Sequence, residues 1–292
     1  MSCQIIIHGG AHDLVSENDK RNTICQHIID SLKDDLCHGA DALDICEKAI
    51  NALENEPLFD AGTGSFIQVD GMIRMDASLM TSDNQLGAVL QISNIKNPIS
   101  VARKLLEDPM HVVLSGAGAD QFAKEMGFNN YDPAIGKQKD TLQKVLKKLN
   151  GDLSYRNISQ HFSSSFNDSL GTVGAVVRDN NGKIAAGTST GGRKVCYPGR
   201  VGDSGIAGNG TFANQYAGIS CTGIGEKILI IGAARLIASY VECGKSIVTA
   251  CDDTIKQLKL IGGLGGFIAI SQKGNMCAVH NTACLTHASF SS

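Results

Sequence analysis

A threonine that could act as a nucleophile stands where a polar stretch of the chain meets an apolar one. Residues of about 128–170 are rich in Lys, Asn, Asp and Ser, and Thr172 follows Gly171 at the start of the apolar run TVGAVV. A Thr hydroxyl is a weak nucleophile and needs a nearby base. If Thr172 becomes the first residue of a chain, its own α-amine, with a pKa near ~8, can be that base at neutral pH.

The same hydroxyl could first cut its own chain. Attack on the carbonyl of Gly171 would release the amine of Thr172, and glycine offers no side-chain obstruction and tolerates strained geometry. An isolated Gly-Thr pair is usually an ordinary boundary between a loop and a strand. The hypothesis of self-cleavage therefore depends on the segments around it.

The first half of the chain must supply part of the framework that holds this junction. Hydrophobic spacing, turn residues and the Asp-Gly hairpin signal predict its elements. The expected strands are 3–8 (ended by Gly9-Gly10), 66–69 and 72–75 (a hairpin around Asp70-Gly71), 86–92 and 112–114. The expected helices cover Ile24 to Leu36, Leu43 to Leu53, a segment from Pro98 through Leu105, and 117–126.

The polar stretch of about 128–171 is expected to be a loose linker, part of it helical over 141–149. After it, a strand from residue 172 pairs with a strand over 183–190 across a turn at 180–182. Helices near 225–242 and 245–259 and strands at 266–270 and 276–280 follow. Hairpins and helices grouped separately favour an α+β fold over a parallel βαβ sheet. We expect one domain, 1–292.

Bulk composition excludes several functions. A net charge of −3 and the absence of Trp give no footprint for nucleic acid or an anionic membrane. No stretch reaches the roughly 18 apolar residues of a membrane span. The ten cysteines show no CxxC or zinc-ligand spacing, and MSCQIII lacks the features of a signal peptide. The expected setting is a reducing compartment, the cytoplasm.

Ten short segments, in order, carry a resemblance to a known family. They are IIIHGGAH (5–12), LFDAGTGSF (58–66), MDASLM (75–80), NPISVARKLLED (97–108), GTVGAVVRD (171–179), GTSTGGR (187–193), GRVGDS (199–204), AGNGTFAN (207–214), SCTGIGE (220–226) and GGLGGFIAI (262–270). With these ten segments in this order, the chain resembles the plant-type (type III) L-asparaginases and isoaspartyl peptidases. These are threonine-nucleophile members of the N-terminal-nucleophile (Ntn) hydrolases, related to glycosylasparaginase and the threonine aspartases.

The resemblance implies a four-layer αββα sandwich with two facing sheets. It implies cleavage between Gly171 and Thr172 into an α chain, 1–171, and a β chain, 172–292, and a homodimer of such units, (αβ)2. Thr172 matches the nucleophile, and Thr190 matches the threonine that hydrogen-bonds the nucleophile region.

Two further motifs match substrate-binding positions of the family. Arg200 and Asp203 in GRVGDS match the pair that grips the α-carboxylate and α-ammonium of the substrate, which suits a guanidinium and a carboxylate. Val201 and Gly202 lie between them in the substrate-binding segment. Thr222 and Gly223 match the oxyanion site of the family. The same four-residue segment, Thr222, Gly223, Ile224 and Gly225, matches residues that line the substrate.

Two other features have weaker implications. His8 is expected to pack and position groups near the site, because the amine already fills the role of the base. The loop around Leu53, Leu58 and Phe59 matches a segment that binds a sodium ion through main-chain carbonyls in relatives. Otherwise no metal and no organic cofactor is expected.

Four positions depart from the family pattern. Thr81-Ser82 stands where relatives usually have Asp-Gly, and Gly205 stands where they usually have proline. Ala283 replaces a usual Glu, and Asn209 replaces a usually small residue. None of these is the nucleophile or one of its expected partners, so they bear on substrate preference more than on the chemistry.

The leading expectation is hydrolysis of isoaspartyl dipeptides and L-asparagine through a covalent β-aspartyl-threonine intermediate, which releases L-aspartate. A glycosylasparaginase is the alternative, although that enzyme usually acts in a secretory or lysosomal setting. A threonine protease acting on other proteins fits less well, because Arg200 and Asp203 favour a free α-amino acid end. A non-catalytic scaffold of the same fold would have little reason to hold these residues together.

Overall fold

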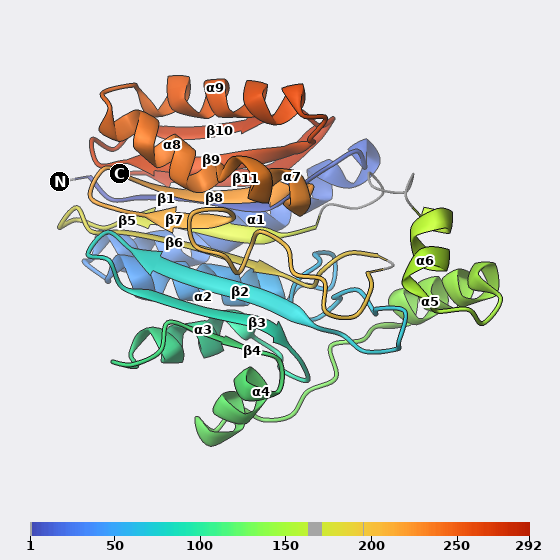
Figure 1. Cartoon of the computed structure of the whole chain (residues 1–292). Helices are drawn as coiled ribbons and strands as arrows, with labels where there is room; N and C mark the ends of the chain where they lie inside the picture. Colours follow the sequence, from blue (N-terminus) through green and yellow to red (C-terminus); the bar gives the residue numbers. More distant parts are fainter. Residues whose placement is uncertain (1, 163–170, 195) are drawn as a thin grey trace.

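The computed structural model describes residues 2–162, 171–194 and 196–292, and its strands form two sheets (Figure 1). The larger sheet has seven strands in the order β11-β1-β5-β6-β2-β3-β4, all antiparallel except the β3–β4 pair. These strands are β1 (Gln4–His12), β2 (Met75–Thr81), β3 (Leu86–Ile92), β4 (Val113–Ser115), β5 (Val173–Arg178), β6 (Ile184–Thr190) and β11 (Cys284–Ser291). The smaller sheet, in the order β10-β9-β8-β7, consists of β7 (Thr211–Ala213), β8 (Ala217–Gly223), β9 (Gly265–Ser271) and β10 (Met276–His280).

Each sheet is covered by its own helices. Four helices contact the seven-stranded sheet: α1 (Val15–Cys37), α2 (Ala42–Glu54), α3 (Pro98–Leu106) and α4 (Gly116–Glu125). Three contact the four-stranded sheet and gather at the other side of the molecule in Figure 1: α7 (Gly225–Ile231), α8 (Ala233–Glu242) and α9 (Ile247–Leu260).

Alternating side chains divide the apolar interior into separate cores. In β1, Ile5 and Ile7 join the core between the seven-stranded sheet and its helices, whereas Ile6 joins a core that also contains Ile268 of β9. Phe267, the neighbour of Ile268, packs in the core under α8 and α9. Successive strand side chains point to opposite faces, so strands buried on both faces are apolar almost throughout.

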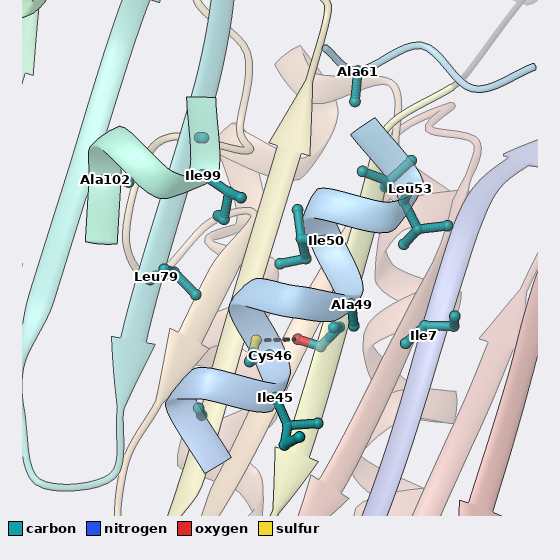
Figure 2. Close-up of a cluster of buried hydrophobic side chains, with 14 of the residues drawn as sticks. Ile7, Ile45, Cys46, Ala49, Ile50, Leu53, Ala61, Leu79, Ile99 and Ala102 are labelled. Carbon is teal, nitrogen blue, oxygen red and sulfur yellow. Dashed lines mark hydrogen bonds between the residues drawn. The ribbon is translucent and has the colours of Figure 1, made fainter. Parts of the chain in front are cut away.

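The core around α2 shows how the first half of the chain holds the second. Cys46, Ile50 and Leu53 of α2 point toward the seven-stranded sheet, and Ile7 of β1 in that sheet belongs to the same core (Figure 2). The Cys46 thiol donates to the carbonyl of Ala175 in β5 at 3.5 Å. Because β5 lies between β1 and β6, and β6 pairs with β2, the two halves of the chain interleave within one sheet. The residue before β5 is Thr172.

Several predicted elements are confirmed, among them the helices before residue 127, the strand at 86–92 and the pairing of the strands after 172. The mixture of helices and antiparallel strands agrees with the predicted α+β class. The helix predicted over 225–242 is two helices, because Gly232 adopts φ 61° between α7 and α8. Strands β7, β8 and β11 had not been predicted.

Two local predictions are wrong. The first strand does not end at Gly9-Gly10 but continues to His12, past an irregularity in its register with β11. The predicted hairpin at 66–75 is only a turn, in which the Gln68 N–H donates to the carbonyl of Met72 at 2.8 Å. The strand that follows, β2, begins at Met75 and had been missed as a central strand.

The predicted loose linker is also wrong over much of its length, although the helix expected within it over 141–149 is confirmed. It contains α5 (Gly136–Leu149) and α6 (Tyr155–Phe162), which extend to one side of the molecule in Figure 1. Val145, Leu149 and Ile158 form a small core there with Val69. The part of that prediction at 163–170 lies outside the described residues. Within the described ranges, none of the helices combines the length and the apolar character that crossing a membrane requires.

Candidate active site

The hydroxyl of Thr172 lies in a buried position at the start of β5. It donates to the hydroxyl oxygen of Thr190, the last residue of β6, at 3.2 Å. The neighbouring residues Val173 and Ser189 pair across the two strands, which fixes the spacing of the two threonines. The Gly192 N–H also donates to the Thr190 oxygen, at 3.3 Å. The structure thus brings together the predicted nucleophile and its predicted partner.

The carbonyl of Gly171 is held from the other side by Asp60. The Asp60 N–H donates to the Gly171 oxygen at 3.2 Å, and a Cβ placed on Gly171 would overlap the Cβ of Asp60. A side chain at residue 171 would therefore displace the segment from this hydrogen bond. The position requires glycine for a steric reason, as the sequence had suggested.

Asp60 is a residue to which the sequence had assigned no role. Its side chain is buried, Oδ1 accepts the Phe66 N–H at 3.2 Å, and Oδ2 has no hydrogen-bond partner among the described residues. Burial raises its pKa well above the usual value for Asp. An acidic residue within the otherwise apolar and glycine-rich segment LFDAGTGSF was the signal that could have indicated it.

Arg200 and Asp203 lie together at the end of a loop beside the nucleophile. The Asp203 side chain is buried, its Oδ2 lacks a partner in the described part of the chain, and burial raises its pKa to about 7. Arg200 donates through Nε to Glu226 at 2.9 Å, and Arg193 contacts the other oxygen of Glu226 at 3.3 Å. A buried carboxyl that lacks a partner on one oxygen, next to a fixed guanidinium, suits a ligand carrying both an ammonium and a carboxylate.

Strands β2 and β3 hold this loop in place. The Gln91 side chain donates to the carbonyl of Arg200 at 2.8 Å, and Asp76 accepts the N–H groups of Gln91 at 2.7 Å and Gly202 at 3.4 Å. Gly225 packs against the same pair of charges, since a Cβ there would lie 2.7 Å from Asp203 and 2.9 Å from Arg200.

The two predicted oxyanion residues lie at the end of β8. The Thr222 hydroxyl accepts the Ala11 N–H at 3.2 Å, which leaves its hydrogen available to donate. Gly223 adopts φ 149°, and a Cβ there would overlap the carbonyl of Leu264. Gly223 is thereby held close to that backbone.

His8 supports the site from between the sheets. It is fully buried and shares a hydrogen bond of 2.9 Å with Ser220, which is linked in turn to Thr188 at 2.7 Å. Burial lowers the pKa of His8 to about 3, despite an opposing contribution from the Thr172 backbone. His8 is therefore neutral at pH 7, and its geometry agrees with the positioning role expected from the sequence.

A single small cavity joins the main candidate residues. Its volume is about 10 Å³, roughly the room that one water molecule needs. The residues lining it are Gly171, Thr172, Thr190, Gly192, Arg193, Arg200, Gly202, Asp203, Ser204 and Gly223. With Gly171 in place, the cavity is too small for an amino acid substrate.

Four candidate residues lie outside that lining, and one of them, Gly225, packs against Arg200 and Asp203. Thr222 is fully buried, Val201 is half-buried, and Ile224 is buried with its N–H donating to the carbonyl of Leu264 at 2.8 Å. Their assignment to the substrate site stays a prediction.

The predicted sodium loop lies at the end of α2. The carbonyl of Leu53 accepts the N–H of Glu56 at 3.2 Å, while Leu58 and Phe59 follow in a turn. The described residues contain no group of three or more His, Cys, Asp or Glu side chains placed to hold a metal ion. The sodium ion stays a prediction from the resemblance, and the chemistry proposed below does not use it.

Comparison with known proteins agrees with this arrangement. The sequence model of the family described as asparaginase matches residues 1–292. A plant-type L-asparaginase of Thermococcus kodakarensis is 37% identical over 97% of this chain and 95% of its own length. The isoaspartyl peptidase/L-asparaginase of Homo sapiens is 36% identical over 94% and 88%, and the isoaspartyl peptidase of Salmonella typhimurium is 35% identical over 95% and 92%.

These matches define the protein as a hydrolase. The chain belongs to the asparaginase family, and the resemblance inferred from its ten motifs is confirmed.

Proposed function

We propose that the chain is a self-processing amidohydrolase that hydrolyses isoaspartyl dipeptides and L-asparagine and releases L-aspartate. One observation carries the proposal: Thr172 shares a cavity with the half-buried Arg200 and the buried Asp203. The names of the relatives, L-asparaginase and isoaspartyl peptidase, support the same substrates.

The first reaction is the cut before Thr172. Its Oγ attacks the carbonyl carbon of Gly171, the C–N bond breaks, and the acyl group moves to oxygen while the nitrogen gains a proton. Water then hydrolyses the ester and leaves a carboxylate on Gly171 and a free amine on Thr172. The Asp60 N–H already donates to the carbonyl oxygen and would stabilise its developing negative charge. The products are an α chain, 1–171, and a β chain, 172–292.

The second reaction is turnover of the substrate. The free amine of Thr172 takes the hydroxyl proton, and Oγ attacks the side-chain carbonyl of the bound aspartyl unit. The amide nitrogen leaves as ammonia or as the amine of an amino acid, and water hydrolyses the β-aspartyl ester. Thr190 orients the nucleophile, and the Thr222 hydroxyl and Gly223 N–H stabilise the oxyanion.

The α-groups of the substrate set its orientation. Arg200 binds the α-carboxylate, and Asp203 binds the α-ammonium through the oxygen that has no partner within the described ranges. The backbone of Gly202 and Gly225 allows the close approach, with Val201 and Ile224 in the flanking segments. An internal peptide segment has no such pair of charges at one carbon, so the site favours a free amino acid end.

The fold and assembly extend the proposal. A core under each set of helices and a third core with residues from both sheets support the four-layer αββα sandwich of the Ntn-hydrolases, formed as one domain. We place the enzyme in the cytoplasm as an (αβ)2 homodimer without an organic cofactor. A structural sodium ion near Leu53, Leu58 and Phe59 remains part of the proposal.

Mass measurement and assay of the purified protein test these reactions together. Wild-type protein should yield two fragments that meet between Gly171 and Thr172, and it should hydrolyse β-Asp-Leu and L-asparagine. The Thr172→Ala variant should remain one uncut, inactive chain. A wild-type chain that stays intact and inert on long incubation, or that acts only on GlcNAc-Asn, would overturn the proposal.

A further inference from the structure

A second, larger cavity lies on the other side of Gly171. Its volume is about 450 Å³, and its walls come from α1, the loop at 57–66 and α5. Among the described residues, Gly171 alone lines both this cavity and the small one around Thr172. Movement of Gly171 after cleavage would connect the two spaces, so that a substrate bound at Thr172 would reach the larger one.

The lining of the larger cavity carries more positive than negative charge. Its cations are Arg21, Lys137 and Lys194, and its carboxyl groups are Glu17 and Asp60. Burial raises the pKa of Asp60 well above its usual value, because desolvation disfavours its charged form. Burial also lowers the pKa of the remaining titratable group of the lining, His12, to about 4, so this imidazole is neutral. An anionic ligand group is therefore favoured.

Arg21 is the best-placed cation to bind that anionic group. Its side chain is only 9% exposed, and its Nη2 lies 3.3 Å from Glu17. Its Nε is buried and has no hydrogen-bond partner among the described residues, while the guanidinium lies 5.6 Å from the centre of the Phe59 ring. A buried donor without a partner is costly, and a carboxylate is the group that a guanidinium binds best.

The rest of the lining is suited to an apolar side chain. Leu58, Phe59, Phe66 and Ile135 contribute apolar surface. The volume falls within the roughly 300–1,000 Å³ of pockets for small molecules. Ammonia, the leaving group of L-asparagine, would use none of this space, and a neutral sugar would leave the excess positive charge without a partner.

We propose that this cavity binds the departing amino acid of an isoaspartyl dipeptide, with Arg21 holding its α-carboxylate and the apolar lining holding its side chain. The inference rests on the proposed function and makes it more specific. It assigns to residues of the α chain a preference for dipeptides over L-asparagine.

Three substrates that share one acyl group test it with the cleaved full-length protein. These are β-Asp-Leu, the same dipeptide with a C-terminal amide, and L-asparagine. A charge-assisted hydrogen bond between Arg21 and the free carboxylate strengthens binding of the dipeptide. We therefore expect kcat/KM for β-Asp-Leu to exceed that for its amide by about tenfold or more. Arg21→Gln should bring this ratio close to one. Because the ratio is measured within one preparation, losses from poor folding or slow cleavage cancel.

Lys20→Gln is the matched control, because it removes one positive charge from the neighbouring, exposed position of α1 outside the cavity lining. It should keep the wild-type ratio. Equal rates for β-Asp-Leu and its amide in the wild type would overturn the inference, as would an unchanged ratio in Arg21→Gln. Hydrolysis of none of the three substrates would instead overturn the proposed function itself.

Discussion

The two sides of the Gly171–Thr172 bond are built differently. On the Thr172 side, the ends of β5 and β6 and the loop that carries Arg200 and Asp203 hold polar groups around a cavity of about 10 Å³. On the Gly171 side, α1, the loop at 57–66 and α5 surround a cavity of about 450 Å³. Strand pairing fixes the positions of Thr172 and Thr190 through backbone hydrogen bonds, whereas the other side is shaped by side chains. The difference suggests that chemistry is set by the sheet and substrate choice by the α chain.

The largest expected effect comes from adding a side chain at Gly171, the residue that lines both cavities. Gly171→Ala places a methyl group against the Cβ of Asp60 and must displace the scissile carbonyl from the Asp60 N–H. Overpacking of this kind costs about 1–3 kcal/mol, so we expect self-cleavage to slow by about tenfold or more. A time course of chain masses after purification measures the rate.

Gly118→Ala is the control for that experiment, because a Cβ at this helical position meets nothing within 4 Å. It should be cleaved like the wild type. If Gly171→Ala were cleaved equally fast, the close fit between Gly171 and Asp60 would have no part in maturation.

The next prediction concerns the Thr172 side and its dependence on pH. Asp203 must be ionised to bind an ammonium, and its pKa in the free site is raised to about 7. The carboxylate is therefore present above pH 7 and is lost as the pH falls through that value. We expect kcat/KM for L-asparagine to fall below pH 7, and Asp203→Asn to lower it by roughly 100-fold at pH 8, because a buried charge loses its partner.

The shape of the pH profile separates binding from chemistry. Protonation of the Thr172 amine would also lower the activity of the enzyme, but it would do so by lowering kcat. Protonation of Asp203 would instead raise KM. An Asp203→Asn variant that cleaves itself normally and keeps the same KM would show that this carboxyl does not bind the substrate.

The same comparison explains what the sequence could predict. Strands β5 and β6 are apolar runs separated by a turn, and Thr172 stands at their edge, so local pattern drew attention to this residue. Its predicted role as nucleophile came from the family motifs around it, since an isolated Gly-Thr pair is usually an ordinary boundary. Asp60 acquires its role through a contact with Gly171, far along the chain, so the local sequence could mark it only as an acidic residue in an apolar, glycine-rich segment. The turn at Gln68–Met72 resembled a hairpin because Asp70-Gly71 favours a tight turn in either setting.

The larger cavity illustrates the same limit. Arg21 lies on α1 and Ile135 directly precedes α5, and only the folded chain brings them to one space. The polar composition of 128–171 predicted a loose linker, yet α5 is held by Val145 and Leu149, which pack with Val69. A few apolar residues at helical spacing were sufficient to order this segment against the loop before β2.

The smallest expected effect tests how rigid the Thr172 side is. Glu226 accepts from Arg200 at 2.9 Å and contacts Arg193 at 3.3 Å, so it holds the guanidinium in the orientation proposed for binding a substrate carboxylate. Glu226→Gln keeps the shape and removes the charge. We expect KM for L-asparagine to rise by several-fold, with kcat and self-cleavage little changed, because such partly exposed pairs contribute about 1 kcal/mol.

Glu242→Gln removes a similar charge from an ion pair with Arg235 at 3.8 Å, outside the lining of both cavities, and should leave KM unaltered. A fall in kcat without a rise in KM for Glu226→Gln would mean that Glu226 supports the reacting groups rather than the orientation of Arg200.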